Sequence, residues 1–286
     1  MTAEQTLIFG AESHLVATLT SPLPGSVRQP WIAVLTNSGV IPRSGPHRMN
    51  VRLARRFAAL GIASIRFDMS GLGDSRRASG TLPVVQQWVA DTRAAMDTAQ
   101  ARFGSDRFFM VGFCSGAEVA HLVALEDTRL RAALLWDLYA YPTPEFKLRA
   151  VLHRLHRAGW RQVLGKIAHR VLRPLRGGGV PSPAARVPEV STVPPREVFA
   201  QRVQALTDAG VELLFAYCGG ESLWFNHRGQ FRRMFAGHAF LDKVAFEFLE
   251  MSDHLVTRHE AQVAFVEMTE GWLRQRLKCD GGGCGK

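Results

Sequence analysis

The stretch GFCSG places two possible nucleophiles between two glycines. A thiol or hydroxyl at the centre of a G-x-nucleophile-x-G turn can attack a carbonyl carbon and form an acyl-enzyme. Such a turn is sharp, and only small residues two places before and two places after the nucleophile let the backbones pass. Cys114 has Gly112 and Gly116 at those places, whereas a nucleophilic Ser115 would have Phe113 at one of them. We therefore predict Cys114 as the nucleophile and Ser115 as a backbone N–H donor to the oxyanion hole.

A thiolate nucleophile requires a base within hydrogen-bonding distance, and that base requires a carboxylate to orient it. His254 follows the last predicted strand in FEFLEMSDHLVT and is our candidate for the base. His259 is a weaker candidate for the base, because it lies beyond this loop at the start of a helix. Without partners of this kind, the turn would be read as an ordinary strand-to-helix connection that holds a buried cysteine.

Two carboxylates follow predicted strands and could orient the base. Glu221 follows the predicted strand VELLFAY and the residues Cys-Gly-Gly, which allow a tight turn out of the strand. It is our prediction for the acid. Asp137 ends the strand before that one and is the alternative, since Glu221 could equally be a solvated loop carboxylate. Asp253 adjoins His254 in the chain, and neighbouring residues rarely face each other. The predicted order nucleophile, acid, base is the order expected for a fold with this type of turn.

The second N–H of the oxyanion hole is expected from the loop after the strand WIAVLT. The stretch NSGVIP supplies Gly39 and Val40 there, and we choose Val40. The stretch RFDMSGLGDS ends the next strand, and we interpret its polar and glycine residues as a buried structural turn near the active-site face. These residues are Asp68, Gly71, Gly73 and Ser75.

The elements that must position these residues alternate along the chain between strands and helices. Continuous apolar runs predict strands at 14–20, 31–37, 62–70, 107–113, 130–140, 211–217 and 244–251, and helical spacing predicts helices at 49–61, 82–103, 115–127, 225–237 and 259–277. This alternation favours a parallel sheet that is covered on both faces. We expect an α/β core at 1–140 and 210–278, a basic helical insertion at 141–209, and a flexible tail at 279–286.

The net charge of +10 comes from the insertion, because residues 146–196 hold eleven Lys and Arg and a single acidic residue, Glu189. The other 24 basic and 24 acidic residues balance. The insertion has apolar residues at helical spacing among these cations, which suits a cap over the active site, a membrane surface or an acidic partner. No basic motif interleaved with aromatic residues indicates nucleic-acid binding.

The sequence has no apolar run long enough to span a membrane, and its N-terminus does not resemble a signal peptide. Its four cysteines are too few and too scattered for a disulfide framework. We expect a cytoplasmic protein, or one that is peripheral at the membrane. The tail cysteines, Cys279 and Cys284, are interpreted as part of a frayed end and not as a metal site.

With these motifs the sequence resembles the α/β-hydrolase superfamily outside residues 141–209. GPHRMNVRLARRFAALGIASIRFDMSGLGDS is similar to a stretch of serine-aminopeptidase-like hydrolases, especially those encoded beside bacterial exosortase and polysaccharide systems. GFCSGA is similar to the cysteine elbow of those proteins and of dienelactone hydrolases. The resemblance implies an α/β-hydrolase fold with a mostly parallel eight-stranded sheet, and a cap inserted after the sixth strand. It also implies acyl chemistry that uses no metal and no organic cofactor.

The sequence departs from this family in having Cys at the elbow, where most relatives have Ser, and Glu as the predicted acid, where Asp is commoner. A cysteine nucleophile supports attack on esters and thioesters, whereas an amide is a poorer substrate because the thiolate leaves more readily than an amine. We expect a hydrolase of a small acyl ester or thioester. The substrate would be free or presented by an acyl carrier protein, by coenzyme A or at an anionic membrane. The alternatives are an acyltransferase and a non-catalytic module that binds an acyl ligand or docks at a membrane.

Overall fold

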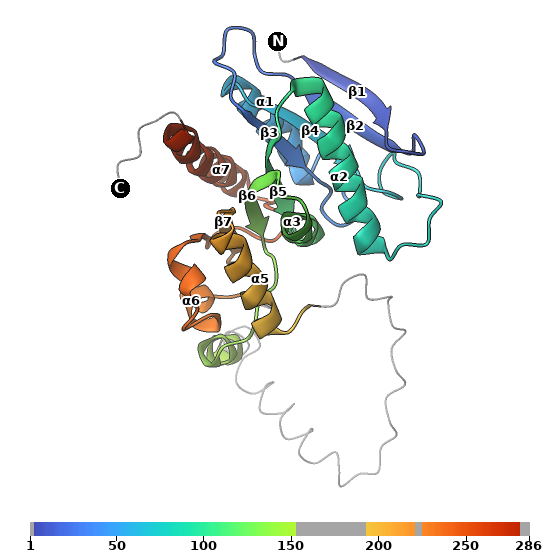
Figure 1. Cartoon of the computed structure of the whole chain (residues 1–286). Coiled ribbons are helices and arrows are strands. Elements are labelled where there is room, and N and C mark those ends of the chain that lie inside the picture. Colours follow the sequence, from blue (N-terminus) through green and yellow to red (C-terminus); the bar gives the residue numbers. More distant parts are fainter. Residues whose placement is uncertain (1–2, 153–192, 221–224, 281–286) are drawn as a thin grey trace.

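The structure is a computed structural model that describes residues 3–152, 193–220 and 225–280 (Figure 1). Its eight strands are β1 (Glu4–Phe9), β2 (Leu15–Thr20), β3 (Trp31–Leu35), β4 (Ala63–Asp68), β5 (Arg107–Phe113), β6 (Leu130–Trp136), β7 (Glu212–Cys218) and β8 (Ala245–Leu249). They form one sheet in the order β1-β2-β4-β3-β5-β6-β7-β8. β1 and β2 pair antiparallel, β2 pairs antiparallel with β4, and all other pairs are parallel. The predicted α/β-hydrolase architecture with its mostly parallel sheet is confirmed.

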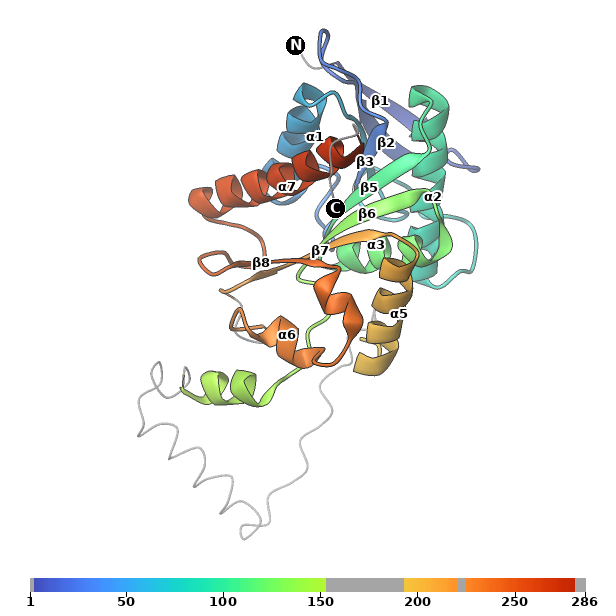
Figure 2. The ribbon, with the colours of Figure 1, turned by 60° about the vertical axis from the view of Figure 1, so that its left-hand side comes forward.

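Helices cover both faces of this sheet (Figures 1 and 2). α1 (Met49–Ala59) and α7 (His259–Asp280) lie on one face, while α2 (Val84–Phe103), α3 (Ser115–Glu126) and α5 (Arg196–Asp208) lie on the other. The short helix α6 (Gln230–Met234) lies between β7 and β8 in the chain, and residues 144–152 are also helical. None of the helices in the described parts of the chain is long and apolar enough to cross a membrane.

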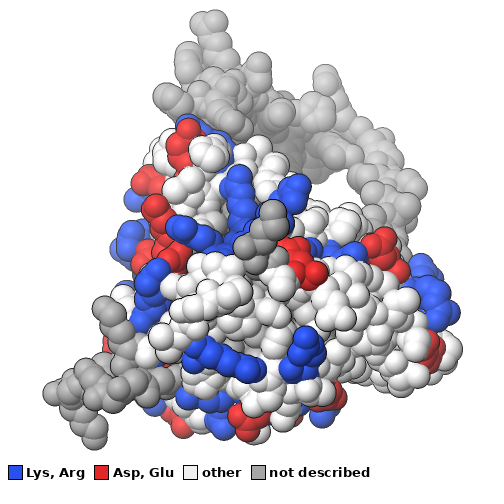
Figure 3. All heavy atoms as spheres, turned by 90° about the horizontal axis from the view of Figure 1, so that it is seen from above, with Lys and Arg blue, Asp and Glu red and all other residues white. Residues whose placement is uncertain are grey.

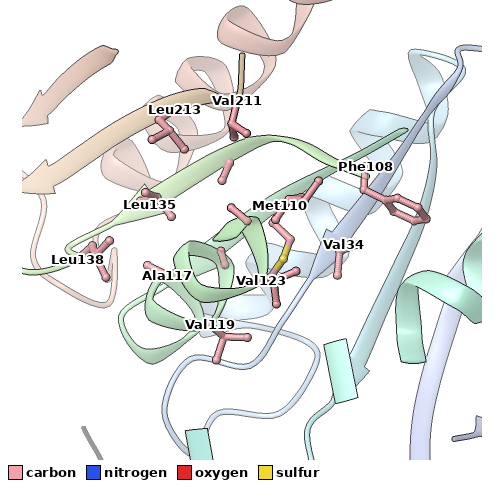
Figure 4. Close-up of a cluster of buried hydrophobic side chains, with 14 of the residues drawn as sticks. Val34, Phe108, Met110, Ala117, Val119, Val123, Leu135, Leu138, Val211 and Leu213 are labelled. Atoms are coloured by element: carbon pink, nitrogen blue, oxygen red, sulfur yellow. The ribbon is translucent and has the colours of Figure 1, made fainter. Parts of the chain in front are cut away.

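The continuous apolar strands follow from this double cover, because successive side chains of a strand point to opposite faces. In β3, Ile32 and Val34 enter the core under α2 and α3, while Ala33 and Leu35 enter the core under α1 and α7. Figure 4 shows the first core, in which Val34, Met110 and Leu135 of three neighbouring strands lie against α3. The two layers of helices therefore fix the sheet, and the C-terminal ends of its strands carry the candidate site.

Two expectations about the elements are corrected, and one strand is added. The predicted insertion at 141–209 includes residues 196–208, but these residues form α5, and its Phe199, Ala200 and Val203 are buried in the core. The alternating charges on its outer face hide this apolar face in the sequence. Residues 225–237 were expected to be helical, and only the five residues of α6 are α-helical. The strand β1 was not predicted from the residues, because this edge strand is mostly exposed and its apolar pattern is weak. The rest of the predicted insertion, from 153 to 192, and the end of the tail lie outside the described residues.

His121 is a buried histidine that the sequence does not explain. It lies on α3 with its ring 5.0 Å from that of Phe199 and has no exposed surface. Neither ring nitrogen has a hydrogen-bond partner among the described residues. Burial, with a smaller contribution from the charge of Arg202, lowers the pKa of His121 from 6.5 to about 3. The folded protein therefore keeps this ring neutral at pH values where the unfolded chain protonates it.

We predict that replacing His121 by Phe reduces the acid sensitivity of the fold. A group whose folded pKa lies below its unfolded pKa costs stability as the pH falls below the unfolded value. Between pH 7.5 and pH 5 this cost is about 2 kcal/mol for a histidine that stays neutral in the folded state. Urea unfolding at both pH values should show that the free energy of unfolding falls by this amount less in His121→Phe than in the wild type. In His259→Gln, a change at an exposed histidine, the free energy of unfolding should fall as much as in the wild type. An equal loss in His121→Phe and wild type would contradict the prediction.

Candidate active site

Cys114 occupies a strained turn between β5 and α3. Its backbone angles are φ +52° and ψ −114°, a conformation that L-residues rarely adopt. The turn is held by hydrogen bonds from the Cys114 N–H to the Trp136 carbonyl (3.0 Å) and from the Ala117 N–H to the Cys114 carbonyl (3.0 Å). This backbone conformation places the side chain of Cys114 above the end of the strand, at the N-terminus of α3 and in the wall of a cavity.

The two glycines of the elbow are required by contacts of the backbone. A Cβ atom at Gly112 would lie 2.4 Å from the carbonyl oxygen of Gly116. A Cβ atom at Gly116 would lie 2.6 Å from the carbonyl oxygen of Asn37 in the loop after β3. Both distances are shorter than any real contact of a Cβ atom. The geometry predicted for the turn, with Cys114 at its centre, is therefore present.

His254 meets the elbow from the loop between β8 and α7. Its Nδ1 lies 2.8 Å from Oδ2 of Asp137, which directly follows β6. The other carboxylate oxygen of Asp137 accepts a hydrogen bond from the Cys218 N–H at 2.9 Å. The indole N–H of Trp136 donates to the His254 carbonyl at 2.9 Å and so holds the loop against β6. The ring of His254 is thus oriented by a carboxylate that is itself fixed.

Two thiols also lie within hydrogen-bonding reach of His254, those of Cys114 and Cys218. The hydrogen bond to Asp137 is the largest cause that raises the pKa of His254 from 6.5 to about 12, followed by the contacts with the two thiols. The His254 side chain is 32% exposed and that of Asp137 11%, so water screens this pair only in part. The ring of His254 therefore holds its proton at neutral pH beside the thiol of Cys114.

Among the described residues, the carboxylate partner of His254 is Asp137. Glu221 lies outside the described residues. Asp137 was the alternative candidate, and it reaches His254 because β6 lies between β5 and β7, so its C-terminal end adjoins the elbow. Asp253 instead accepts a hydrogen bond from the Thr257 N–H at 2.8 Å. His259 is an exposed residue at the start of α7.

The two predicted oxyanion donors lie in the elbow itself and in the turn after β3. Ser115 is the first residue of α3 and lines the cavity, and its hydroxyl oxygen accepts a hydrogen bond from the Gly39 N–H at 2.9 Å. Val40, our predicted second donor, lies beside Gly39 in a turn with 84% of its surface exposed. The turn after β3 therefore contacts the elbow through Gly39, the neighbour of Val40 in the chain.

Asp68 holds this turn in place through its carboxylate. Its buried carboxylate accepts hydrogen bonds from the Asn37 side-chain amide (3.0 Å), the Arg43 N–H (2.6 Å) and the Asp74 N–H (3.1 Å), and it pairs with the Arg43 guanidinium. The Ser75 hydroxyl donates to the Asp68 carbonyl at 2.6 Å. The contacts within RFDMSGLGDS agree with the structural interpretation of this stretch, since these bonds connect β4 to the turn that reaches the elbow.

A cavity of about 720 Å³ opens beside Cys114, Asp137 and His254. Much of its wall is aromatic or aliphatic, and the residues that complete it were not singled out in the sequence. They are Glu118, Leu138, Tyr139, Ala140, Tyr141, Pro142, Val193, Tyr217, Cys218 and Phe225. Some could have been found from their positions, because Leu138 and Tyr139 follow β6, Cys218 ends β7 and Glu118 lies one helical turn after Cys114.

The strained elbow, the histidine after β8 and the acid at the end of a neighbouring strand define an α/β hydrolase. The family model of the serine aminopeptidases, S33, matches residues 33–189, more than half of the chain. The chain belongs to this hydrolase family. The name of the family refers to a serine enzyme, whereas this chain has Cys114 at the centre of its elbow.

Solved structures support the same fold. Est1E from Butyrivibrio proteoclasticus is 14% identical over 95% of this chain and 98% of its own, with a TM-score of 0.58. A proline iminopeptidase from Mycobacterium smegmatis is 16% identical over 97% and 100%, with a TM-score of 0.58. A putative dienelactone hydrolase from Klebsiella pneumoniae is 15% identical over 96% and 99%, with a TM-score of 0.57. The search of curated proteins found no match.

We predict that Asp137→Asn lowers the pKa of His254 towards its ordinary value of 6.5, because it removes the largest cause of the raised pKa. Loss of the orienting carboxylate should also reduce hydrolytic turnover by about 10²- to 10⁴-fold. A histidine-resolved NMR titration and a steady-state assay check the two effects.

Two matched carboxylate variants serve as controls for Asp137→Asn. Asp253→Asn and Glu221→Gln should leave the pKa of His254 near the wild-type value. If Glu221→Gln instead lowers this pKa and the turnover while Asp137→Asn does not, Glu221 is the acid and our assignment is wrong.

Proposed function

We propose that the chain is a cysteine-dependent hydrolase of acyl esters or thioesters. The observation that carries this proposal is the position of the Cys114 thiol. It lies on a strained elbow, within hydrogen-bonding reach of His254, whose Nδ1 bonds Asp137 at 2.8 Å. A nucleophile, a base and an orienting carboxylate in this order of contact support nucleophilic acyl chemistry.

The acylation step uses the proton that His254 holds. The thiolate of Cys114 attacks the acyl carbonyl carbon, and the carbonyl oxygen becomes an oxyanion. The Ser115 N–H at the N-terminus of α3 and an N–H of the turn around Gly39 support this charge, with Val40 as our predicted donor. The oxyanion then collapses, the bond to the leaving alcohol or thiol breaks, and His254 gives its proton to that leaving group.

Deacylation reverses these roles. The neutral imidazole left by the first step removes a proton from water, and the hydroxide attacks the thioester of Cys114. The second oxyanion collapses, the acid product leaves, and the proton on His254 restores the starting pair. Asp137 keeps the ring oriented and supports its positive charge in both steps. An amide is a poorer substrate than an ester, because the thiolate leaves the tetrahedral intermediate more readily than an amine.

The cavity favours an acyl group with apolar surface. Tyr217 and Phe225 stack with ring centroids 4.1 Å apart, and both line the cavity with Leu138 and Tyr141. A pocket of this volume accommodates a small acyl chain or ring. These walls support a small hydrophobic acyl ester or thioester as the substrate class.

We predict that p-nitrophenyl esters acylate the protein at Cys114, which intact mass spectrometry detects as an added acyl mass. Cys114→Ala should form no adduct and should lose at least about 10⁴-fold in turnover, because the nucleophile is gone. Ser115→Ala, its neighbour in the elbow, keeps the backbone donors and should still form the adduct. Comparison of short and medium acyl chains measures the size that the cavity accepts.

An adduct that is lost in Ser115→Ala and kept in Cys114→Ala would show that the nucleophile is the serine. Absence of both adduct and turnover in the wild type would leave a binding protein without catalysis, and the hydrolase proposal would fail.

A separate observation favours docking of the protein at an anionic membrane. In the helical residues 144–152, Leu148, Val151 and Leu152 lie at helical spacing and are 60%, 48% and 54% exposed. They open the segment that carries the net positive charge, whereas acidic and basic groups are interspersed on the face shown in Figure 3. An exposed apolar stripe at the start of a basic segment of the sequence suits the surface of an anionic bilayer.

We predict that the protein sediments with vesicles that contain anionic phospholipid and not with vesicles of phosphatidylcholine alone. Binding should weaken as salt rises, because salt screens the charges. The double change Leu148→Asp and Leu152→Asp should abolish most of the binding, while Val27→Asp, at a loop residue that is 79% exposed, should not. Equal sedimentation of all three proteins would contradict docking through this stripe.

A further inference from the structure

Asp137, Cys218 and His254 form a cluster whose donor atoms differ in kind. One carboxylate oxygen, one sulfur and one ring nitrogen all lie within 4.8 Å of one another. Cys218 is the last residue of β7, is 1% exposed and lines the cavity. Acyl transfer, as derived above, uses Asp137 and His254 and assigns no step to this thiol.

We propose that Asp137, Cys218 and His254 bind a thiophilic divalent cation, with Zn²⁺ as the type, and that this cation inhibits the enzyme. Zn²⁺ takes sulfur, imidazole nitrogen and carboxylate oxygen in tetrahedral sites, at about 2.3, 2.0 and 2.1 Å. These bond lengths place neighbouring ligand atoms about 3.3 to 3.6 Å apart. The present atoms lie within 4.8 Å of one another, and the cavity leaves room for a fourth ligand.

For the metal to bind, the hydrogen bond between Asp137 and His254 must break and its two atoms must move apart. Their bonded atoms are 2.8 Å apart, about half an ångström less than two ligands of one Zn²⁺. The Cys218 N–H fixes the other oxygen of Asp137 at 2.9 Å and so leaves the oxygen that faces His254 free to turn to the metal. Such a bond to the second oxygen is how proteins orient carboxylate ligands.

Charge balance favours the same ion. The carboxylate of Asp137 and a thiolate at Cys218 together carry two negative charges, which neutralise a divalent cation in a largely apolar cavity. A hard cation such as Mg²⁺ prefers oxygen ligands and octahedral geometry, so it gains little from sulfur and imidazole. The cluster should therefore select Zn²⁺ or Co²⁺ over Mg²⁺.

Inhibition follows from the ligands and rests on the proposed function. A metal bound to His254 displaces the proton that protonates the leaving group, and it removes the hydrogen bond between Asp137 and the ring. The site would then lie within the acyl pocket as a regulatory site, and the metal would take no part in the reaction.

The test is a calorimetric titration of the reduced, full-length protein with ZnCl₂, with MgCl₂ as the control cation. Cys279→Ser and Cys284→Ser are introduced throughout, so that tail thiols do not compete. We expect one Zn²⁺ per chain, no binding of Mg²⁺, and an affinity at least tenfold lower in both Cys218→Ser and His254→Ala. CoCl₂ should give a thiolate-to-metal absorption band that Cys218→Ser removes.

His254→Ala keeps the test decisive if Cys218→Ser fails to fold, because the side chain of His254 is partly exposed. An unchanged Zn²⁺ affinity in His254→Ala, or a Co²⁺ complex without the thiolate band, would overturn the metal site. The titration needs no substrate, so its outcome is independent of acyl-enzyme formation. If the protein turns over esters, the concentration of Zn²⁺ that halves the rate should rise at least tenfold in Cys218→Ser, and a chelator should restore the wild-type rate.

Discussion

The site depends on one backbone constraint, the left-handed conformation of Cys114. This conformation is disfavoured for a residue with a side chain, and the fold maintains it from both sides. Gly112 and Gly116 let strand, helix and the loop after β3 approach at distances that a Cβ atom would prevent. The Cys114 N–H is tied to β6, the strand that also supplies Asp137. The strain of the turn and the position of the acid are thus set by the same pair of strands.

The second feature of the site is how few polar groups control one histidine. Asp137 and two thiols contact His254, and a tryptophan from β6 anchors its loop. Because the surrounding wall is largely apolar, the carboxylate acts on the ring with limited screening and favours its charged form. A protonated ring suits a cysteine, which attacks as a thiolate, better than a serine, which must first transfer its proton to a neutral ring. The replacement of Ser by Cys in this family member therefore agrees with the electrostatics of its histidine.

The sequence predicted those parts of the protein that depend on local pattern. Apolar runs and glycine spacing located seven strands, four of the long helices and the register of the elbow, since small residues are needed at fixed places. They could not decide between Asp137 and Glu221, because both follow strands whose ends meet at one edge of the sheet. Only the lateral position of β6 brings Asp137 to His254. The contact of Gly39 with the elbow also involves residues far apart in the chain, as does the network around Asp68 in the same turn.

The thiol of Cys218, at the end of β7, gives the site a sulfur donor that the acyl chemistry does not use. In a site of serine, histidine and aspartate, all donor atoms are oxygen or nitrogen, and a hydrolytic pocket of that kind has modest affinity for soft metal ions. Here one thiol directly follows β5 and the other ends β7, the two strands that flank β6 and its acid. Any cation that prefers sulfur and imidazole meets its ligands at the groups that would transfer the proton. The same proximity that would activate the Cys114 thiol would therefore make the site sensitive to such cations.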